Sequence, residues 1–202
     1  DDTGHHVTRV GKYAAVIADE LGFDQQAIEL LEQAAKLHDI GKIGVPDSVL
    51  LKEGKLEAEE FELIKSHCGI GNNIINPMST GDVEAYQQHT QIGATLLDED
   101  GYPVMELAAT IAQTHHEKWD GSGYPLGIKG DDIPIEGRIT AVADVFDALS
   151  SKRPYKPAFS REKCFSILQD GRGSHFDPKV LDAFFARTDE IVGIQIRYAE
   201  HE

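Results

Sequence analysis

His115-His116-Glu117-Lys118-Trp119-Asp120-Gly121-Ser122-Gly123-Tyr124-Pro125 is the stretch from which the rest of the chain can be interpreted. It follows residues 104–114, whose apolar side chains recur at the spacing of a helix. Two glycines and a proline fall within its last five residues, so the helix must end beside the histidines. Adjacent imidazoles at a helix end suit either chemistry or a plain polar terminus near the last carbonyls. The rest of the sequence decides between these interpretations.

The composition predicts one sizeable folded domain. The chain has 202 residues, of which 41% are hydrophobic, enough for a real core. Its formal net charge of -16 at pH 7 argues against a nucleic-acid polymer as partner, because the phosphates would be repelled. A small phosphate ligand held by local cations stays compatible with this charge. No apolar run approaches the roughly 20 residues that span a bilayer, so we expect a cytoplasmic segment without a membrane contact.

The chain begins with Asp1 rather than Met. We therefore expect residues 1–202 to form a single domain in the C-terminal part of a longer protein, with a sensor or receiver domain upstream. Cys68 and Cys164 show no paired metal spacing, and each falls in a helical stretch. We expect both to be buried thiols in a reducing cytoplasm. The nine histidines are then the compositional feature to explain.

Hydrophobic spacing predicts an all-α protein, with about eight or nine helices packed around a core that holds the site. Asp24 and Ser160 are expected N-caps, and Pro178 is expected at a first helical position. Asp47 to Lys55 is expected to be a loop. In the last segment a helix is expected, and a strand over Ile194 to Ile196 is the alternative. The expected helices cover 7–21, 25–38, 57–75, 82–97, 104–114, 133–149, 161–169, 178–186 and 191–198.

Imidazole and carboxylate side chains recur at the ends or inner faces of these helices. Each could alone be a cap or a core histidine, but together they form a set of metal-ligand type. Such a set, without thiolate, suits octahedral Mn²⁺ or Fe²⁺ better than structural zinc. It is too large for one ion, whereas two ions roughly 3.5–4 Å apart that share a carboxylate form a hydrolytic device for phosphoesters. The candidates are Asp2, His6, His38, Asp39, either His67 or His89, His115, His116 and Asp144.

The densest basic cluster of this acidic chain follows the helix that carries Asp144 and Asp147. It reads Ser151-Lys152-Arg153-Pro154-Tyr155-Lys156-Pro157. An ordinary solvated loop is one interpretation. The other is an anion clamp, because arginine can grip two phosphate oxygens and lysine adds a point charge.

Taken together, these motifs resemble the HD-GYP family, a branch of the HD-domain metal phosphohydrolases. The resemblance covers nearly the whole chain and is highly specific. It is carried by the stretch 115–125 and by Asp2-Thr3-Gly4-His5-His6, His38-Asp39-Ile40-Gly41-Lys42, His89-Thr90-Gln91-Ile92-Gly93, Ala143-Asp144-Val145-Phe146-Asp147-Ala148-Leu149 and Arg153-Pro154-Tyr155-Lys156. It implies a cyclic di-GMP phosphodiesterase that forms linear pGpG and in some members GMP, while some relatives cleave a mixed cyclic GMP-AMP.

The resemblance also implies roles for single residues. Asp39 would bridge two ions and, with Lys42 at the scissile phosphate, form the catalytic pair. One ion would be held by His6, His38, Asp39 and Asp144, and the other by Asp39, His89, His115 and His116. Substrate would be bound by Lys42, Asp147, Arg153, Tyr155 and Lys156. The loop Gly123 to Pro125 would shape the site without holding metal.

Two features depart from the family pattern. Asp2 stands where members with three metals carry Glu, so we expect two divalent ions, iron or manganese, with a third as the alternative. The segment from about Cys68 to Gln88 looks like an insertion. Either His67 or His89 could therefore fill the central histidine position, and the spacing to His115 favours His89.

Three functional hypotheses follow. The first is an active cyclic-dinucleotide phosphodiesterase. The second is a catalytically weak module that binds the nucleotide or docks on partners, either a diguanylate cyclase through the Gly-Tyr-Pro loop or a PilZ-type protein. The third is another HD hydrolase acting on a nucleoside phosphate, and the Gly-Tyr-Pro loop argues against it. A homodimer is the expected assembly if the domain associates.

Overall fold

The structure is a computed structural model that describes residues 2–52, 54–75, 103–152 and 157–199. Within these ranges the chain is helical and forms no strand, which confirms the predicted all-α class. The helices are α1 (Asp2–Glu20), α2 (Gln25–Ala35), η1 (Ile40–Gly44), α3 (Asp47–Leu50), α4 (Ala58–Lys65), α5 (His67–Ile75), α7 (Pro103–Thr114), η3 (Gly130–Asp132), α8 (Ile135–Ser150), α9 (Arg161–Asp170), α10 (Pro178–Ala186) and α11 (Thr188–Arg197).

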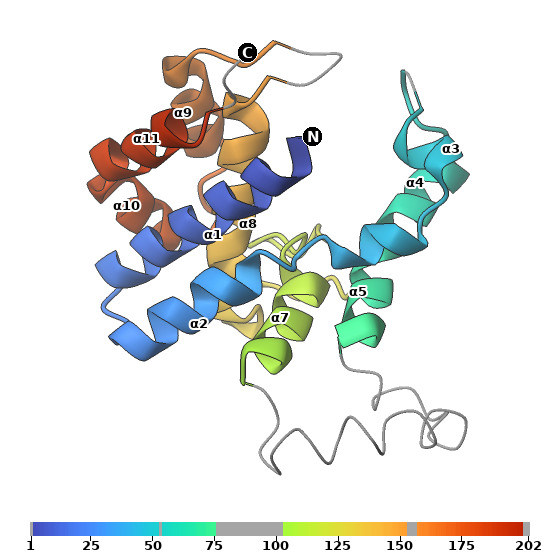
Figure 1. Cartoon of the computed structure of the whole chain (residues 1–202), viewed down its shortest axis with the longest axis horizontal. Helices are drawn as coiled ribbons and strands as arrows, with labels where there is room; N and C mark the ends of the chain where they lie inside the picture. The colour runs from blue at the N-terminus through green and yellow to red at the C-terminus, as the bar shows by residue number, and fades with distance from the viewer. Residues whose placement is uncertain (1, 53, 76–102, 153–156, 200–202) are drawn as a thin grey trace.

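The core lies around α1, which packs against α2 on one side and against α8, α10 and α11 on the other (Figure 1). Aromatic side chains join these helices. The ring of Tyr13 from α1 meets Phe146 from α8 edge-on at 5.3 Å, and Phe146 meets Phe184 from α10 at 5.1 Å. All three are fully buried. This core fixes the positions of α1 and α8, which carry two of the candidate ligands.

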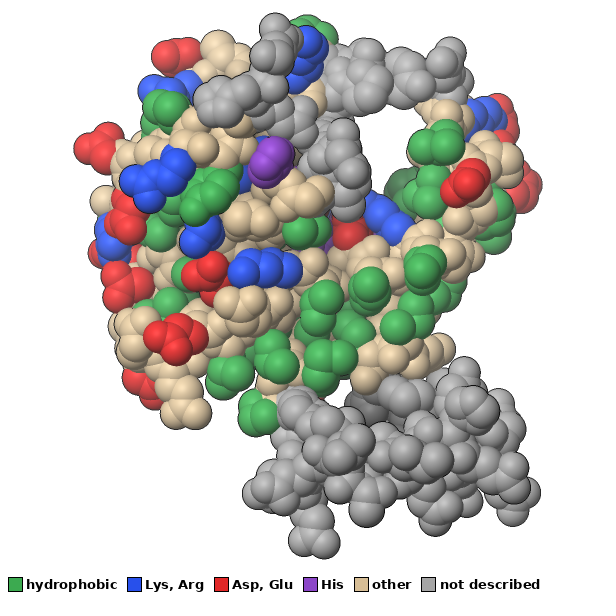
Figure 2. All heavy atoms as spheres, in the orientation of Figure 1, with side chains coloured by type: hydrophobic (Ala, Val, Ile, Leu, Met, Phe, Trp, Pro, Cys, Tyr) green, Lys and Arg blue, Asp and Glu red, His purple; other side chains and the backbone are tan. Residues whose placement is uncertain are grey.

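A second group of helices, α3, α4 and α5, lies at one side of the molecule (Figure 1). It is held to the core because α5 packs against both η1 and α7. In the space-filling view, a hollow separates the α3–α4 segment from the rest of the described molecule, with acidic and basic side chains at its floor (Figure 2). The arrangement leaves the ends of α2, α5 and α7 close together.

Most predicted helix starts are confirmed. Asp24 accepts a hydrogen bond from the amide of Ala27 at 2.8 Å, Ser160 caps α9, and Pro178 opens α10. The segment 188–197 is a helix, so the strand alternative is wrong. The expected loop 47–55 begins with the short helix α3. The expected helix 82–97 lies outside the described residues.

The single helix predicted over 57–75 is divided into α4 and α5 at Ser66. Here side chains bind carbonyls that a continuing helix would use. Ser66 Oγ donates to the carbonyl of Leu63 at 2.7 Å, and Nδ1 of His67 contacts the carbonyl of Ile64 at 2.5 Å. This competition with the backbone ends α4 and turns His67 inward.

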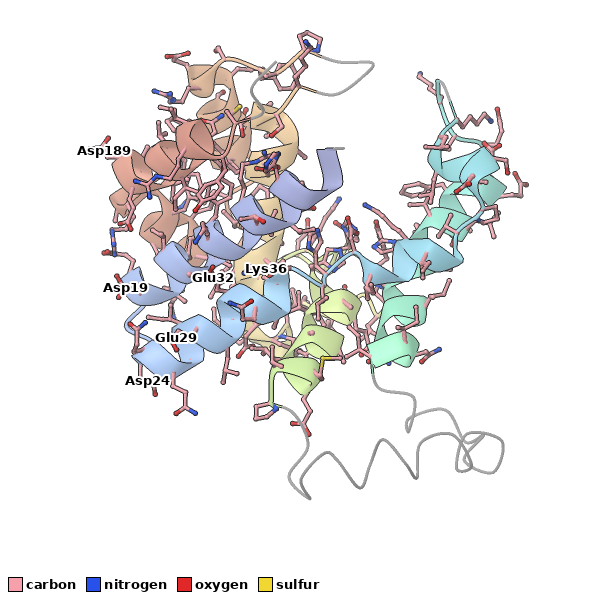
Figure 3. All side chains as sticks on the ribbon, viewed as in Figure 1. Asp19, Asp24, Glu29, Glu32, Lys36 and Asp189 are labelled. Atoms are coloured by element: carbon pink, nitrogen blue, oxygen red, sulfur yellow. The ribbon has the colours of Figure 1, made fainter. Side chains whose placement is uncertain are left out.

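One group of acidic side chains lies at the turn between α1 and α2, away from the predicted site (Figure 3). Figure 3 labels Asp19, Asp24 and Glu29 near the turn between α1 and α2, and Glu32 further along α2. His6 lies 13 positions before Asp19 in the same helix, a distance of about 20 Å along the axis.

None of the described helices is long and apolar enough to cross a membrane.

Candidate metal centre

Helix ends bring most of the predicted ligands together. His6 lies in the first turns of α1, Asp144 lies in α8, and His115 and His116 directly follow α7. The His38 ring lies 5.4 Å from that of His6 and 5.2 Å from that of His115, measured between ring centroids. These side chains come from helices far apart in the sequence, so the packing described above is what creates the site.

Asp39 is the centre of this cluster. Its Oδ1 lies 3.4 Å from Nε2 of His67 and 3.9 Å from Nε2 of His115. Its Oδ2 lies 3.4 Å from Nε2 of His38 and is ion-paired with Lys42. The two oxygens of one carboxylate therefore face two different groups of histidines. This is the position that a carboxylate bridging two cations must occupy.

Three histidines of the centre, His38, His67 and His115, are held by one ring nitrogen and present the other. Nδ1 of His38 contacts the carbonyl of Ala35 at 2.8 Å, and Nδ1 of His115 contacts that of Ile111 at 2.9 Å. His67 does the same with its own helix, as described above. A carbonyl can only accept, so Nδ1 carries a proton and Nε2 is the nitrogen that can bind a metal ion or a second proton. Hydrogen bonds of this kind orient metal-binding histidines.

Buried polar atoms without hydrogen-bond partners test whether a cation fits. Nε2 of His38, Oδ1 of Asp39 and Nε2 of His115 all lack such a partner among the described residues. An unsatisfied buried polar group costs about 1–3 kcal/mol, so several of them converging on one point indicate a ligand. Two groups have ligand atoms within 4.8 Å of one another: His6, His38 and Asp39, and His67, Cys68, His115 and His116. The donor set therefore fits metal binding.

Burial keeps the second group of histidines neutral. It lowers the pKa of His115 well below the usual value, and the neighbouring His116 and His38 add to this effect. Burial also lowers the pKa of His116 to about 4, and it lowers the pKa of His67. Neutral imidazoles retain the lone pair that binds a metal ion.

The carboxylates favour a positive charge at the first group. Burial would lower the pKa of His38, but Asp144 and Asp39, at 3.7 and 3.4 Å from Nε2, raise it to about 10. Burial would raise the pKa of Asp39, but His38 and then Lys42 hold it well below its usual range. Either a proton or a metal ion at Nε2 of His38 would balance these carboxylates.

Glycines allow the close approach that brings Asp39 to His67. A Cβ on Gly41 would lie 1.9 Å from the carbonyl oxygen of His67 and 2.4 Å from the amide nitrogen of Gly71. The backbone of η1 therefore lies directly on α5, and no side chain fits between them. The sequence His38-Asp39-Ile40-Gly41 thus positions its carboxylate by means of its glycine.

The stretch 117–125 closes over the centre. A Cβ on Gly123 would lie 2.3 Å from the amide nitrogen of Lys118, so this turn requires glycine. Glu117 is 2% exposed and accepts hydrogen bonds from the amides of Leu126 and Gly127 at 2.6 and 3.2 Å. The ring of Tyr124, which precedes a cis proline, stacks on His116 at 4.9 Å. The loop thereby covers one face of a candidate ligand.

The prediction that Asp147 contacts the substrate needs correction. Asp147 is 1% exposed, and Arg9 grips both of its oxygens, at 2.6 Å from Nε and 2.9 Å from Nη2. Nδ1 of His6 also contacts Oδ2 at 2.8 Å. With both oxygens engaged inside the protein, Asp147 cannot reach a nucleotide, and it orients His6 instead.

Several predicted residues are not placed. His89, Arg153, Tyr155 and Lys156 lie outside the described residues, as does the side chain of Asp2, so their roles stay predictions. Sequence reasoning assigned no role in the centre to Cys68, Glu117 or Arg9. Only Cys68 carried a signal, because it adjoins a candidate ligand, His67.

Another hollow, of about 380 Å³, lies between α1, α2 and α11. Several of its charged residues pair with one another: Lys12 pairs with Glu32 at 3.3 Å, and Arg187 pairs with Asp19 at 2.7 Å. It contains none of the converging histidines. The centre around Asp39 is therefore the candidate functional site.

Comparison with known proteins identifies relatives over the whole chain. A cyclic di-GMP phosphodiesterase of Vibrio cholerae is 42% identical, covering 99% of this chain and 39% of the relative. A cyclic di-GMP phosphodiesterase of Thermotoga maritima is 41% identical, covering 100% and 49%. A 3'3'-cGAMP-specific phosphodiesterase of V. cholerae is 40% identical, covering 96% and 33%. The chain thus spans less than half the length of these relatives.

The fold is shared with a solved structure as well. The crystal structure of a cyclic GMP-AMP-specific phosphodiesterase of V. cholerae superposes with a TM-score of 0.60 at 19% identity, covering 94% of this chain and 46% of that one. The model of the HD domain family matches residues 2–180, a range that includes every described side chain of the centre. The chain therefore belongs to the HD domain family, in agreement with the resemblance drawn from its motifs.

Proposed function

We propose that this domain hydrolyses cyclic di-GMP to linear pGpG, with GMP as the alternative end product, as a metal-dependent phosphodiesterase. The position of Asp39 is the observation that carries the proposal, because its two oxygens face separate histidine groups. Two cations that share a carboxylate are a recurring arrangement for the hydrolysis of phosphodiesters. Relatives that carry the name cyclic di-GMP phosphodiesterase at 42% and 41% identity support the substrate.

Two divalent ions, iron or manganese, would occupy the centre. His6, His38, Asp39 and Asp144 would hold the first, and Asp39, His115, His116 and a central histidine the second. When bound, such ions supply Lewis acidity and activate water near neutral pH. A third ion at Asp2 stays the alternative.

We infer that the central histidine is His67, although sequence spacing favours His89. Three features support His67: its Nε2 is 3.4 Å from Asp39, its Nδ1 is held by a carbonyl, and Gly41 packs on its backbone. Replacing each histidine by alanine distinguishes the two. His67→Ala should lower the bound metal toward one ion per chain, while His89→Ala should leave it unchanged. The opposite result would assign the ligand to His89.

The remaining residues would act on the substrate. Lys42 is ion-paired with Asp39, yet its side chain is 44% exposed, so Nζ can turn toward a phosphate. Arg153 and Lys156 would grip the phosphates, and Tyr155 would contact the nucleotide. Water attacks phosphorus in line, and the 3′ oxygen leaves. The fixed imidazoles keep their geometry during this step.

Chromatography of the nucleotide after incubation with the metal-loaded protein tests the proposal. Wild type should convert cyclic di-GMP, and Asp39→Asn should slow turnover by about 10³-fold or more. Asp131→Asn is the matched control, because that side chain is 83% exposed. Cyclic GMP-AMP should be assayed in parallel, since one relative at 40% identity is named for it. Unchanged substrate with Mn²⁺ and with anaerobic Fe²⁺ would refute the activity.

The second candidate is a binding module. Tight binding of cyclic di-GMP to the metal-loaded protein without turnover would favour it. Docking on a diguanylate cyclase or a PilZ-type protein, a homodimer, and a cytoplasmic location remain predictions, as does an upstream sensor or receiver domain. Pull-down with these two classes of protein and sedimentation of the isolated domain would test them.

A further inference from the structure

Cys68 lies inside the metal centre rather than in an ordinary core position. It is fully buried, and its Sγ is 3.6 Å from Nε2 of His67. That nitrogen is the one that faces Asp39. The sulfur also lies within 4.8 Å of ligand atoms of His115 and His116. The thiol thus shares one point of convergence with three imidazoles.

The other cysteine of the chain shows what a structural thiol looks like here. Cys164 is equally buried, but its Sγ donates to the carbonyl of Phe159 at 3.9 Å and it packs in the apolar core. It therefore has the surroundings of an ordinary buried cysteine. The two cysteines differ in chemistry although they are alike in burial.

The distances fit a metal ion. With a Zn–S bond of about 2.3 Å, a Zn–N bond of about 2.0–2.1 Å and an angle of about 110° between them, sulfur and nitrogen are about 3.6 Å apart. This matches the separation of Cys68 Sγ and His67 Nε2. His115 Nε2 is buried without a hydrogen-bond partner among the described residues and belongs to the same group. An unsatisfied nitrogen and a thiol at coordination spacing point to one shared cation.

We propose that Cys68 is a thiolate ligand of the second ion, beside the bridging Asp39 and the imidazoles of His67, His115 and His116. As the metal–sulfur bond forms, the thiol proton leaves to solvent. The centre is then chemically asymmetric. The first position has imidazole and carboxylate donors alone, whereas the soft sulfur raises the affinity of the second position for Zn²⁺ and Co²⁺ relative to the first position. This inference rests on the metal centre of the proposed function.

Cobalt titration tests the ligand directly. Addition of Co²⁺ to the metal-free protein should produce a thiolate-to-cobalt charge-transfer band in the near ultraviolet that saturates at one equivalent per chain. Cys68→Ser should bind Co²⁺ without this band. Cys164→Ala should keep the band in full.

The outcomes separate this inference from the proposed function. Wild-type protein that binds two Co²⁺ ions without the band would overturn the thiolate ligand and leave the metal centre intact. Persistence of the band in Cys68→Ser would also overturn it. A failure of wild type to bind any Co²⁺ would overturn both proposals. Because the wild-type spectrum alone decides the first outcome, a misfolded variant does not remove the test.

Discussion

At the scale of single residues, the site depends on pairs that hold each other inside the protein. Arg9 is 3% exposed and binds both oxygens of Asp147, which in turn holds Nδ1 of His6. Arg9 and Asp147 are separated by 138 positions in the sequence. Neither belongs to the set of candidate ligands, yet the orientation of one ligand follows from their pairing.

Removing one partner of this buried pair should cost more than removing both. We expect Asp147→Leu to destabilise the fold by about 3–5 kcal/mol, because it leaves Arg9 without its carboxylate. The double variant Arg9→Met/Asp147→Leu should be more stable than the sum of the single effects predicts. Urea unfolding of wild type, the single variants Arg9→Met and Asp147→Leu, and the double variant measures this coupling. The exposed pair Arg172 and Asp182 is the control and should show no measurable coupling. Additive effects at Arg9 and Asp147 would contradict the prediction.

Lys42 should contribute to rate rather than to metal binding. In the proposed reaction its Nζ offsets the charge that develops on the phosphate, an effect worth about 10²–10³-fold in kcat. Lys42→Met should therefore lower kcat by this factor while the bound metal stays constant. Lys52→Met, which removes a lysine paired with Glu60, is the control and should leave kcat unchanged. A loss of metal in Lys42→Met would show that the residue instead maintains the centre.

At the scale of helices, local signals predicted most elements, and the exceptions have local causes that a hydrophobic pattern does not reveal. Caps at Asp24 and Ser160 act within one turn, so the sequence contains all the information they need. The division at Ser66 depends on side chains choosing nearby carbonyls over solvent, which apolar periodicity does not report. The short helix α3 was missed because its four residues are too few to show a period.

The packing of η1 on α5 gives a prediction for a pair of glycines. Gly41→Ala would put a methyl group 1.9 Å from the carbonyl of His67, so η1 and α5 must separate. We expect a loss of stability of about 1–3 kcal/mol and a weaker second metal site, measured by unfolding and by metal content. Gly69→Ala is the control. Gly69 lies in the facing helix α5, and a Cβ there would have nothing within 4 Å, so this variant should be neutral or stabilising. Equal behaviour of the two variants would refute the close packing.

At the scale of the whole molecule, the identity of the ligands could be predicted more readily than their arrangement. His38, Asp39, His115 and His116 stand in recognisable motifs at helix ends. Which of two histidines joins them depends on how α5 lies against η1, a contact between distant segments. The position of Cys68 beside the histidines and the burial of Asp147 also depend on contacts between distant segments. Side-chain direction follows from packing of complete helices, which single motifs do not determine.

His175, which lies where two distant segments meet, makes the stability of the folded protein depend on pH. The carbonyls of His175 and Ser174 accept hydrogen bonds from the amides of Trp119 and Asp120, at 3.1 and 2.9 Å. Burial, with the nearby charge of Lys118, lowers the pKa of His175 from 6.5 to about 4. Between these values the unfolded chain binds more protons, so the folded state loses stability as the pH falls.

We expect His175→Phe to remove this part of the acid sensitivity. Phenylalanine keeps the ring that stacks on Phe176 at 4.1 Å but does not titrate. Relative to the variant, wild type should lose about 1–2 kcal/mol between pH 6.5 and pH 4, a value reduced for partial exposure. Urea unfolding at stepped pH measures the difference. His5→Gln, at an exposed histidine, is the control, and an identical pH slope in wild type and His175→Phe would contradict the assignment.

Metal binding should stabilise the whole domain, because the ions join helices from both groups through buried atoms that otherwise lack partners. At a free concentration 100-fold above the dissociation constant, an ion that binds only the folded state adds about 2.7 kcal/mol. For a domain of this size, this raises the melting temperature by about 5–11 °C. Scanning calorimetry with Mn²⁺ and with a chelator measures the shift, which Asp131→Asn should retain. Asp39→Asn should lose most of it, since Asp39 faces both groups, and a full shift in that variant would mean that the stabilising ions bind elsewhere.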